Sequence, residues 1–270
     1  MQPKFITVEG ISLAYFEKNQ DAEDIIFFIH GNSSSSQIWS QQWESVLLSP
    51  YRLIALDMPA HGQSSCSPDY SLPTLGRIVA AGIDQLVGER NYIIAGLSLG
   101  TNVLAESLAY SLRPQGIILI GSCVLGGACT MESMLQPGVD MHAAFTDEVS
   151  EEELLQYWAL TGRSPEDENY LLFSKDYYAT QDNFRSKMFA TVMAGNISDE
   201  AGLLQQSGLP VLVIFGKEEK VCNIDYLDNA GIRLWQDTVF KIPGAGHFAN
   251  IDQPEKLDGL IAEYAKELFK

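Results

Sequence analysis

Basic residues are scarce in this chain of 270 residues. Only 17 Lys and Arg stand against 35 Asp and Glu, which gives a formal net charge of −18. A surface of this sign repels phosphate backbones and anionic lipid head groups. We therefore expect neither nucleic acid nor a membrane among the partners of the protein.

Long hydrophobic runs and patterned cysteines are also missing. No stretch approaches the ~18 uncharged apolar residues of a membrane span, and the N-terminal sequence MQPKFITVEG lacks the basic and apolar regions of a signal peptide. The four cysteines show no CxxC spacing, in a chain long enough to bury a core without disulfides. These features predict a cytoplasmic protein whose thiols, at Cys66, Cys123, Cys129 and Cys222, are free.

Apolar residues make up 46% of the chain and gather in short runs separated by amphipathic segments of helix length. This alternation predicts an α/β fold, with an eight-stranded, mostly parallel sheet that carries helices on both faces. The first two runs, 5–9 and 11–17, indicate an antiparallel hairpin that turns at Gly10. Buried strands are expected at 25–29, 51–56, 92–95, 116–120, 211–215 and 238–242. Helical periodicity marks 73–87, 101–112, 224–234 and 254–268.

One interval, 124–206, contains no strand-like run but has helical segments such as 151–160 and 182–194. We expect it to be a helical cap inserted after the sixth strand, on a core domain formed by residues 1–123 and 207–270. Its flexible methionines and its phenylalanines predict an apolar lining suited to an acyl or alkyl chain. These side chains are Met131, Met134, Met141, Met188, Met193, Phe145, Phe173, Phe184 and Phe189.

The sequence GLSLG at 96–100 matches the G-x-S-x-G pattern of a nucleophile elbow. It directly follows the predicted strand 92–95 and opens the helical pattern 101–112, which is the strand-to-helix context that this turn requires. Side chains at Gly96 and Gly100 would crowd the neighbouring backbone. The pattern therefore predicts Ser98 as a catalytic nucleophile.

A serine nucleophile needs an imidazole base and an acid to orient it. Of the four histidines, His247 follows the last predicted strand in the glycine-rich sequence PGAGHF, so we expect it to be the base. The loop after the seventh strand reads FGKEEKV and makes Glu219 the first choice of acid, with Glu218 and Asp225 as alternatives. The order serine, acid, histidine is one of the documented orders of such triads.

The negatively charged intermediate of acyl transfer needs two hydrogen-bond donors. The backbone N–H of Leu99 is expected to supply one, and Asn32, in the loop after the third strand, the other. No histidine stands in an HxH or HExxH pattern, so we expect no metal and no cofactor.

Four motifs together resemble the α/β-hydrolase superfamily: HGN at 30–32, DMPAHGQS at 57–64, GLSLG at 96–100 and GAGH at 244–247. More narrowly, the serine run after HGN, a glutamate as acid and a tyrosine in the cap resemble the metal-independent N-acyl-homoserine lactone hydrolases. One departure is Leu99, where that family has a tryptophan.

The resemblance to these lactone hydrolases implies roles for individual residues. It implies a triad of Ser98, Glu219 and His247, with Asn32 and Leu99 as oxyanion donors. It also places Tyr157 at the lactone head group, and Trp158 and Ser33 are expected to contact substrate beside it. Ser98 excludes the haloalkane dehalogenases, which share HGN, because their chemistry needs a carboxylate nucleophile.

These residues predict a serine hydrolase that cleaves an ester or lactone of a small, largely apolar acyl substrate. An acyl-homoserine lactone is the first candidate, and a general carboxylesterase or thioesterase is the alternative. A third possibility is a ligand receptor with slow turnover on the same fold, since this fold hosts many functions. The sequence leaves the oligomeric state open.

Overall fold

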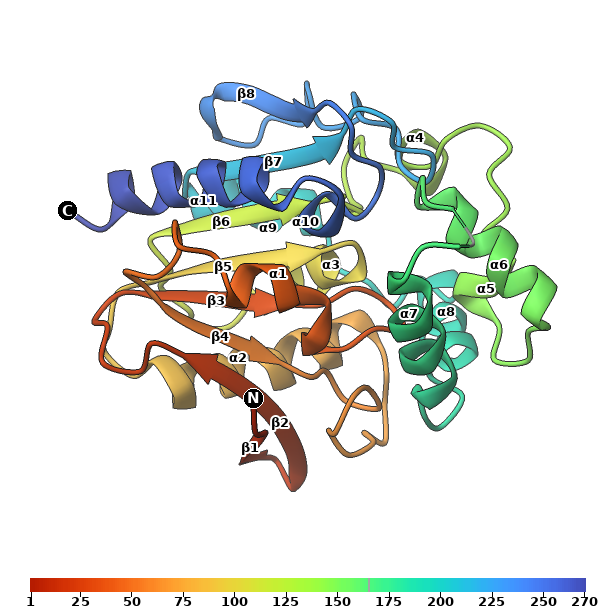
Figure 1. The fold of residues 1–270 in the computed structure, drawn as a ribbon, viewed down its shortest axis with the longest axis horizontal. Coiled ribbons are helices and arrows are strands. Elements are labelled where there is room, and N and C mark those ends of the chain that lie inside the picture. Colours follow the sequence, from red (N-terminus) through yellow and green to blue (C-terminus); the bar gives the residue numbers. More distant parts are fainter. Residues whose placement is uncertain (165) are drawn as a thin grey trace.

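The computed structural model describes residues 1–164 and 166–270. Within them, an eight-stranded sheet runs through the molecule in the order β1-β2-β4-β3-β5-β6-β7-β8 (Figure 1). The β1/β2 and β2/β4 pairs are antiparallel and all other neighbouring pairs are parallel, so the predicted opening hairpin and mostly parallel sheet are confirmed. The strands are β1 (Lys4–Val8), β2 (Ile11–Lys18), β3 (Ile25–Ile29), β4 (Arg52–Leu56), β5 (Tyr92–Leu97), β6 (Gly116–Ile120), β7 (Val211–Gly216) and β8 (Leu234–Ile242).

Strand β3 shows why the sheet is buried on both faces. All five of its residues are apolar and inaccessible to solvent. Because successive side chains of a strand point to opposite faces, Phe27 joins the core on one side of the sheet and Phe28 joins the core on the other. A parallel strand covered on both faces carries this kind of continuous apolar run.

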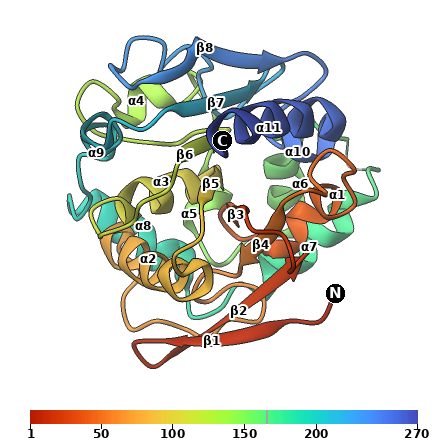
Figure 2. The same ribbon diagram turned by 90° about the vertical axis from the view of Figure 1, so that its left-hand side faces the viewer.

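Two groups of helices cover these faces (Figure 2). One face carries α2 (Leu72–Val87), α3 (Leu99–Ser107) and α9 (Glu200–Ser207); the other carries η1 (Ser36–Trp39), α1 (Ser40–Trp43), α10 (Ala249–Asp252) and α11 (Pro254–Leu268). Pro73 and Pro254 lie in the first turns of α2 and α11, where the missing N–H costs no helical hydrogen bond.

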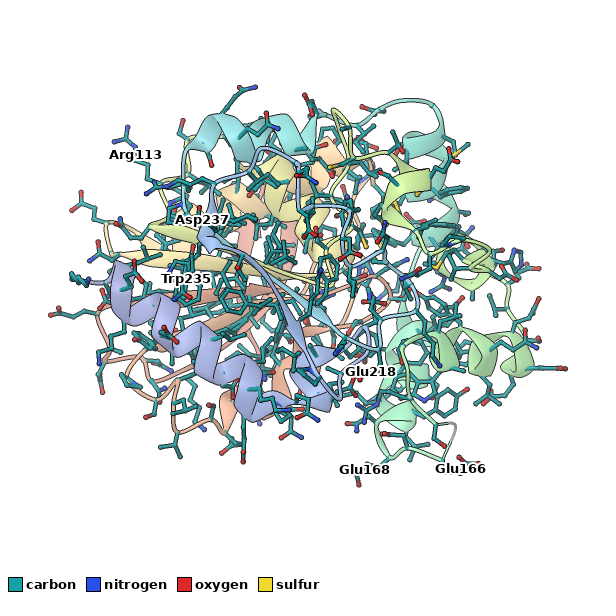
Figure 3. The ribbon with its side chains drawn as sticks, turned by 90° about the horizontal axis from the view of Figure 1, so that it is seen from above. Arg113, Glu166, Glu168, Glu218, Trp235 and Asp237 are labelled. Carbon is teal, nitrogen blue, oxygen red and sulfur yellow. The ribbon has the colours of Figure 1, made fainter. Side chains whose placement is uncertain are left out.

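A further group of helices lies between β6 and α9 and covers the carboxyl ends of the strands (Figure 1). Seen from above, Glu166 and Glu168 mark its outer edge, and Glu218 lies where it meets the sheet (Figure 3). Among the described residues of 124–206 there is no named strand, whereas α9 packs against α3. The group comprises α4 (Met131–Met134), α5 (His142–Phe145), α6 (Glu151–Leu160), α7 (Asn169–Ala179) and α8 (Phe184–Met193).

The helix expected at 224–234 is wrong. Between β7 and β8 the chain makes successive turns, with the N–H of Tyr226, Asp228 and Ala230 each bonded to the carbonyl three residues earlier. Leu227 reaches the core from these turns, which explains the apolar spacing that suggested a helix. The expected helix at 101–112 is also shorter, because α3 ends at Ser107.

No helix in the described part of the chain is long and apolar enough to cross a membrane.

Candidate active site

Ser98 lies at the sharp turn between β5 and α3. Its φ of 52° and ψ of −123° are strained for a residue with a side chain, as a nucleophile elbow requires. The turn is possible because of the two flanking glycines. A Cβ atom on Gly96 would lie 2.5 Å from the carbonyl oxygen of Gly100, and one on Gly100 would lie 2.5 Å from the carbonyl oxygen of Ile29. The strand, turn and helix predicted for GLSLG are all present.

His247 and Glu219 meet at the carboxyl ends of the last two strands. Nδ1 of His247 lies 2.8 Å from Oε2 of Glu219, and both side chains are buried. The other carboxylate oxygen of Glu219 accepts a hydrogen bond of 2.8 Å from the N–H of Val221. The backbone N–H of His247 donates to the carbonyl of Thr161 at 3.1 Å, so the loop that carries the imidazole is held on both sides.

The two groups shift each other's protonation. Burial lowers the pKa of His247, but the charge and hydrogen bond of Glu219 outweigh burial and raise the pKa to about 9. Burial raises the pKa of Glu219, yet the imidazole and the N–H groups of Val221 and Cys222 bring it below its usual value. The pair therefore favours an imidazole that holds a proton strongly beside an ionised carboxylate.

The two alternative acids have other partners. Glu218 accepts hydrogen bonds from the N–H groups of Gly244 (2.9 Å) and Ala245 (3.0 Å), so it supports the loop that carries the imidazole without touching the ring. Asp225 forms an ion pair with Lys241. Of the three candidates, only Glu219 is bonded to His247 in the described structure.

Ser98 and His247 both border the segment that follows β6. The N–H of Ser98 donates to the carbonyl of Ile120 at 2.9 Å, and the imidazole lies against the α-carbon of Gly121, where a Cβ atom would meet Cε1 at 3.1 Å. The hydroxyl of Ser98 is bonded to the thiol of Cys123, with 3.8 Å between Oγ and Sγ. Ser98 and the imidazole thus both contact residues 120–123.

Ser98, Leu99 and Asn32 line a cavity between the ends of the strands and helices α4, α5, α6 and α8. Four of the five methionines expected there line it, and Phe145 and Phe189 stack on each other with ring centroids 4.1 Å apart. The remaining lining residues are largely aliphatic. The expected lining is wrong for Met193, which is 69% exposed on α8, and for Phe173 and Phe184, which are buried elsewhere.

The loop after β3 is fixed by the inserted helices. The side-chain amide of Asn32 donates to the carbonyl of Ala144 at 2.8 Å and accepts from the hydroxyl of Ser33 at 3.0 Å. Ser33 is itself held by Arg185 and by His61. Ser33 does not line the cavity, so the structure places it behind Asn32 instead of against a substrate.

Tyr157 lines the cavity, but its neighbour Trp158 does not. Burial raises the pKa of the Tyr157 phenol, which keeps it neutral. Trp158 is fully buried, packs against Phe173 with the ring centroids 4.8 Å apart and the ring planes tilted by 39°, and donates from Nε1 to the carbonyl of Ser164 at 2.8 Å. Successive residues of a helix point about 100° apart, so the two side chains of α6 face different surroundings, and this cavity does not support the substrate contact expected at Trp158.

Three possible metal ligands do come together among the described residues, although the sequence shows no ligand spacing. Donor atoms of Glu219, Cys222 and His247 lie within 4.8 Å of one another. Each carboxylate oxygen of Glu219 already accepts a hydrogen bond, one from the imidazole and one from Val221. These contacts fit an acid and imidazole pair.

Sequence reasoning missed two residues of this site. Cys123 and Asn102 both line the cavity, and the amide of Asn102 donates to the carbonyl of Cys123 at 2.7 Å. The one available signal was position. Cys123 follows β6, the strand next to the one that ends at Ser98, so its side chain lies at the same edge of the sheet.

Comparisons with known proteins agree with this architecture. The chain is 24% identical to a 2-hydroxy-6-oxo-6-(2'-aminophenyl)hexa-2,4-dienoic acid hydrolase from Metapseudomonas resinovorans. The alignment covers 93% of this chain and 87% of that protein. A variant of the N-acyl homoserine lactonase AidH, solved with N-hexanoyl homoserine lactone, superposes with a TM-score of 0.89 at 23% identity, covering 99% of this chain and 98% of that one. An esterase from Rhodococcus superposes with a TM-score of 0.80 at 20% identity, covering 99% and 100%. Residues 26–258 match the model of the alpha/beta hydrolase family, and the chain therefore belongs to that family.

Proposed function

We propose that the protein is a serine hydrolase that cleaves an ester or a lactone through an acyl-enzyme. The observations that support this most directly are Ser98 at a strained elbow that lines an apolar cavity, and a buried imidazole, bonded to a carboxylate, that borders the same segment after β6. A lone serine hydroxyl is a poor nucleophile, and this arrangement supplies the base that it needs.

In the proposed reaction, His247 takes the proton of Ser98 as Oγ attacks the substrate carbonyl. The hydroxyl first turns from Cys123 toward Nε2 of the imidazole, a rearrangement consistent with the long catalytic hydrogen bonds of unliganded enzymes. The backbone N–H groups of Leu99 and Asn32 stabilise the oxyanion, and the imidazolium protonates the leaving oxygen. Water then hydrolyses the acyl-enzyme with the same base.

The cavity favours an acyl group over a polar substrate. Its methionines adapt to flexible chains, and its polar lining groups are few and gathered near Ser98. We infer that residues 124–206 act as a cap that binds the acyl chain. An N-acyl-homoserine lactone is the leading candidate, since a variant of AidH was solved with N-hexanoyl homoserine lactone and Tyr157 offers a neutral phenol to a lactone head group.

An open-chain ester or thioester is the second candidate. The Rhodococcus esterase, which superposes with a TM-score of 0.80, has the same fold and supports this alternative. A receptor with slow turnover would use the same cavity for binding and would differ only in rate. The free thiols suit a reducing compartment, and we propose a cytoplasmic location for either enzyme.

The test is a hydrolysis screen of the purified protein, in EDTA, against p-nitrophenyl esters and acyl-homoserine lactones of graded chain length. We expect turnover of at least one series in the wild type. Ser98→Ala should remove essentially all of it, about 10⁴-fold or more, while leaving the circular dichroism spectrum unchanged. Activity in the Ala variant within tenfold of the wild type would refute the mechanism, and an EDTA-sensitive rate restored by zinc would refute its independence from metal.

A further inference from the structure

Cys123, which lines the cavity, lies beside the fully buried Cys222. They follow neighbouring strands, β6 and β7, and their sulfur atoms are 3.6 Å apart without a bond between them. A disulfide is about 2.0 Å long, so a small side-chain movement would bring these sulfurs to bonding distance. Nothing in the proposed hydrolysis uses either thiol as a reactant.

The two thiols differ in access. Cys123 lines the cavity, with its sulfur also 3.8 Å from the hydroxyl of Ser98, so a small solute that enters the cavity reaches it. Cys222 has no exposed surface and lies behind it, with its sulfur 3.9 Å from that of Met134. An oxidant from solution therefore meets Cys123 first.

The two thiols also differ in acidity. The hydrogen bond from Cys222 lowers the pKa of the Cys123 thiol despite burial, and the nearby imidazole of His247 lowers it further. The hydrogen bond with Cys123, together with burial, raises the pKa of Cys222. The thiolate is the form that reacts with peroxides, so the accessible thiol is also the more reactive one.

We propose that Cys123 and Cys222 form a redox modification site, in which Cys123 reacts with hydrogen peroxide and Cys222 closes a reversible disulfide. The Cys123 thiolate attacks one peroxide oxygen, the O–O bond breaks, and the departing hydroxide takes up a proton to leave as water. Cys222 then attacks the sulfur of the resulting sulfenic acid, the S–O bond breaks and a second water leaves. Two thiols have lost two protons and two electrons, and the peroxide has been reduced to two waters.

A disulfide between Cys123 and Cys222 would add a covalent link between distant parts of the chain. Cys123 lies three residues after β6 and Cys222 lies six residues after β7, so a bond between them would close a covalent loop that contains α4 to α9 and β7. It would also draw the sulfur of Cys123 away from the Ser98 hydroxyl. Cys222 additionally protects Cys123, because a sulfenic acid that is captured as a disulfide escapes further oxidation.

Mass spectrometry tests the proposal independently of any substrate, so its failure is distinct from failure of the hydrolase assignment. Protein reduced with dithiothreitol is desalted, treated with graded hydrogen peroxide and blocked with N-ethylmaleimide. We expect two of the four thiols to be lost within one chain, and dithiothreitol to restore both. All four thiols remaining blockable, or disulfides forming only between chains, would overturn the proposal.

Peptide mapping identifies the partners. Trypsin leaves Cys123 and Cys129 together on residues 91–163, whereas Cys222 lies alone on 221–233. The control variant Cys66→Ser with Cys129→Ser removes this ambiguity and retains the pair. It should link 91–163 to 221–233 as readily as the wild type, within about twofold in peroxide concentration. A wild-type disulfide that is lost in this variant would contradict the pairing.

The resolving role of Cys222 has its own test. In Cys222→Ser, Cys123 should become a sulfenic acid that dimedone traps, and should advance to the sulfinic acid at peroxide concentrations that leave the wild type as a disulfide. Unchanged sensitivity of Cys123 in this variant would show that Cys222 does not capture it. If this variant folds poorly, the peptide map of the wild type still shows whether the disulfide between Cys123 and Cys222 forms.

Discussion

Nδ1 of His247 lies 2.8 Å from Oε2 of Glu219, and both side chains are buried. The other carboxylate oxygen, Oε1, accepts a hydrogen bond from the backbone N–H of Val221. The contact with His247 fixes which imidazole nitrogen faces Glu219, and it leaves Nε2 for Ser98 in the proposed reaction. The same contact raises the affinity of the imidazole for a proton. Two of the predictions below depend on it.

Glu219→Gln should lower kcat by about 10⁴-fold, as removal of the acid does in other triads, because the imidazolium formed during reaction loses its negative partner. Glu218→Gln is the matched control. Its amide oxygen can still accept from Gly244 and Ala245, so we expect a loss of less than about tenfold. Both are measured as kcat on the best substrate of the screen, and the reverse ranking would assign the acid to Glu218.

The rate should rise with pH as the imidazole loses its proton, because only the neutral ring can accept the serine proton. Since Glu219 raises the pKa of His247 to about 9, the acid limb of kcat/KM should have its midpoint above the ordinary value of 6.5. In Glu219→Gln the midpoint of the residual activity should move to lower pH. A profile flat from pH 5 to 9 would exclude His247 as the base.

Acyl-chain length should control kcat/KM. Each buried methylene contributes up to ~0.8 kcal/mol, or about fourfold, until the cavity is full. Phe189→Ala removes one ring of the stacked pair at the cavity wall and should shift the optimum to longer chains. Met193→Ala, at an exposed position of the same helix, should leave the optimum in place. A length series that is flat in the wild type would contradict an acyl pocket.

Tyr157→Phe tests recognition of the lactone head group. If the phenol donates a hydrogen bond to substrate in this buried site, its loss should cost about 1 to 3 kcal/mol, or roughly 5- to 150-fold in kcat/KM. The comparison uses a lactone and an open-chain ester of the same acyl length. A loss confined to the lactone supports head-group recognition, an equal loss on both makes the residue a general contact, and no loss removes the main argument for a lactone.

The sequence predicted the sheet well because buried parallel strands have an unmistakable composition. IIFFI in β3 leaves no alternative to a strand covered on both faces. Ser98 could be predicted from the sequence for a similar reason. The glycines on either side of it are required because backbone atoms leave no room for a side chain at Gly96 or Gly100. The turns at 224–234 were missed because Leu227 meets the core from irregular backbone, and apolar spacing alone does not distinguish that from a helix.

Contacts between distant segments set the remaining details. Tyr157 and Trp158 are adjacent aromatic residues, and the sequence does not indicate which of them lines the cavity. The packing of α6 places Tyr157 at the cavity and Trp158 against Phe173 of α7. The sequence suggested Ser33 as a substrate contact, but in the structure its hydroxyl accepts a hydrogen bond from Arg185, which lies 152 residues further along the chain. Likewise, the proximity of Cys123 to Cys222 follows from the pairing of β6 with β7, which no local pattern encodes.

The hydrogen bond from Asn32 to Ala144 affects whether the inserted helical segment of this protein can be exchanged for that of a relative. It fastens a loop of the sheet, which is proposed to stabilise the oxyanion, to a helix of the inserted segment, and Arg185 fastens the neighbouring Ser33 to the same segment. Grafting this segment from a relative would therefore exchange the acyl pocket and loosen the oxyanion loop together. Chimaeras should lose turnover along with their original chain-length preference unless the partners of Asn32 and Ser33 are transplanted as well.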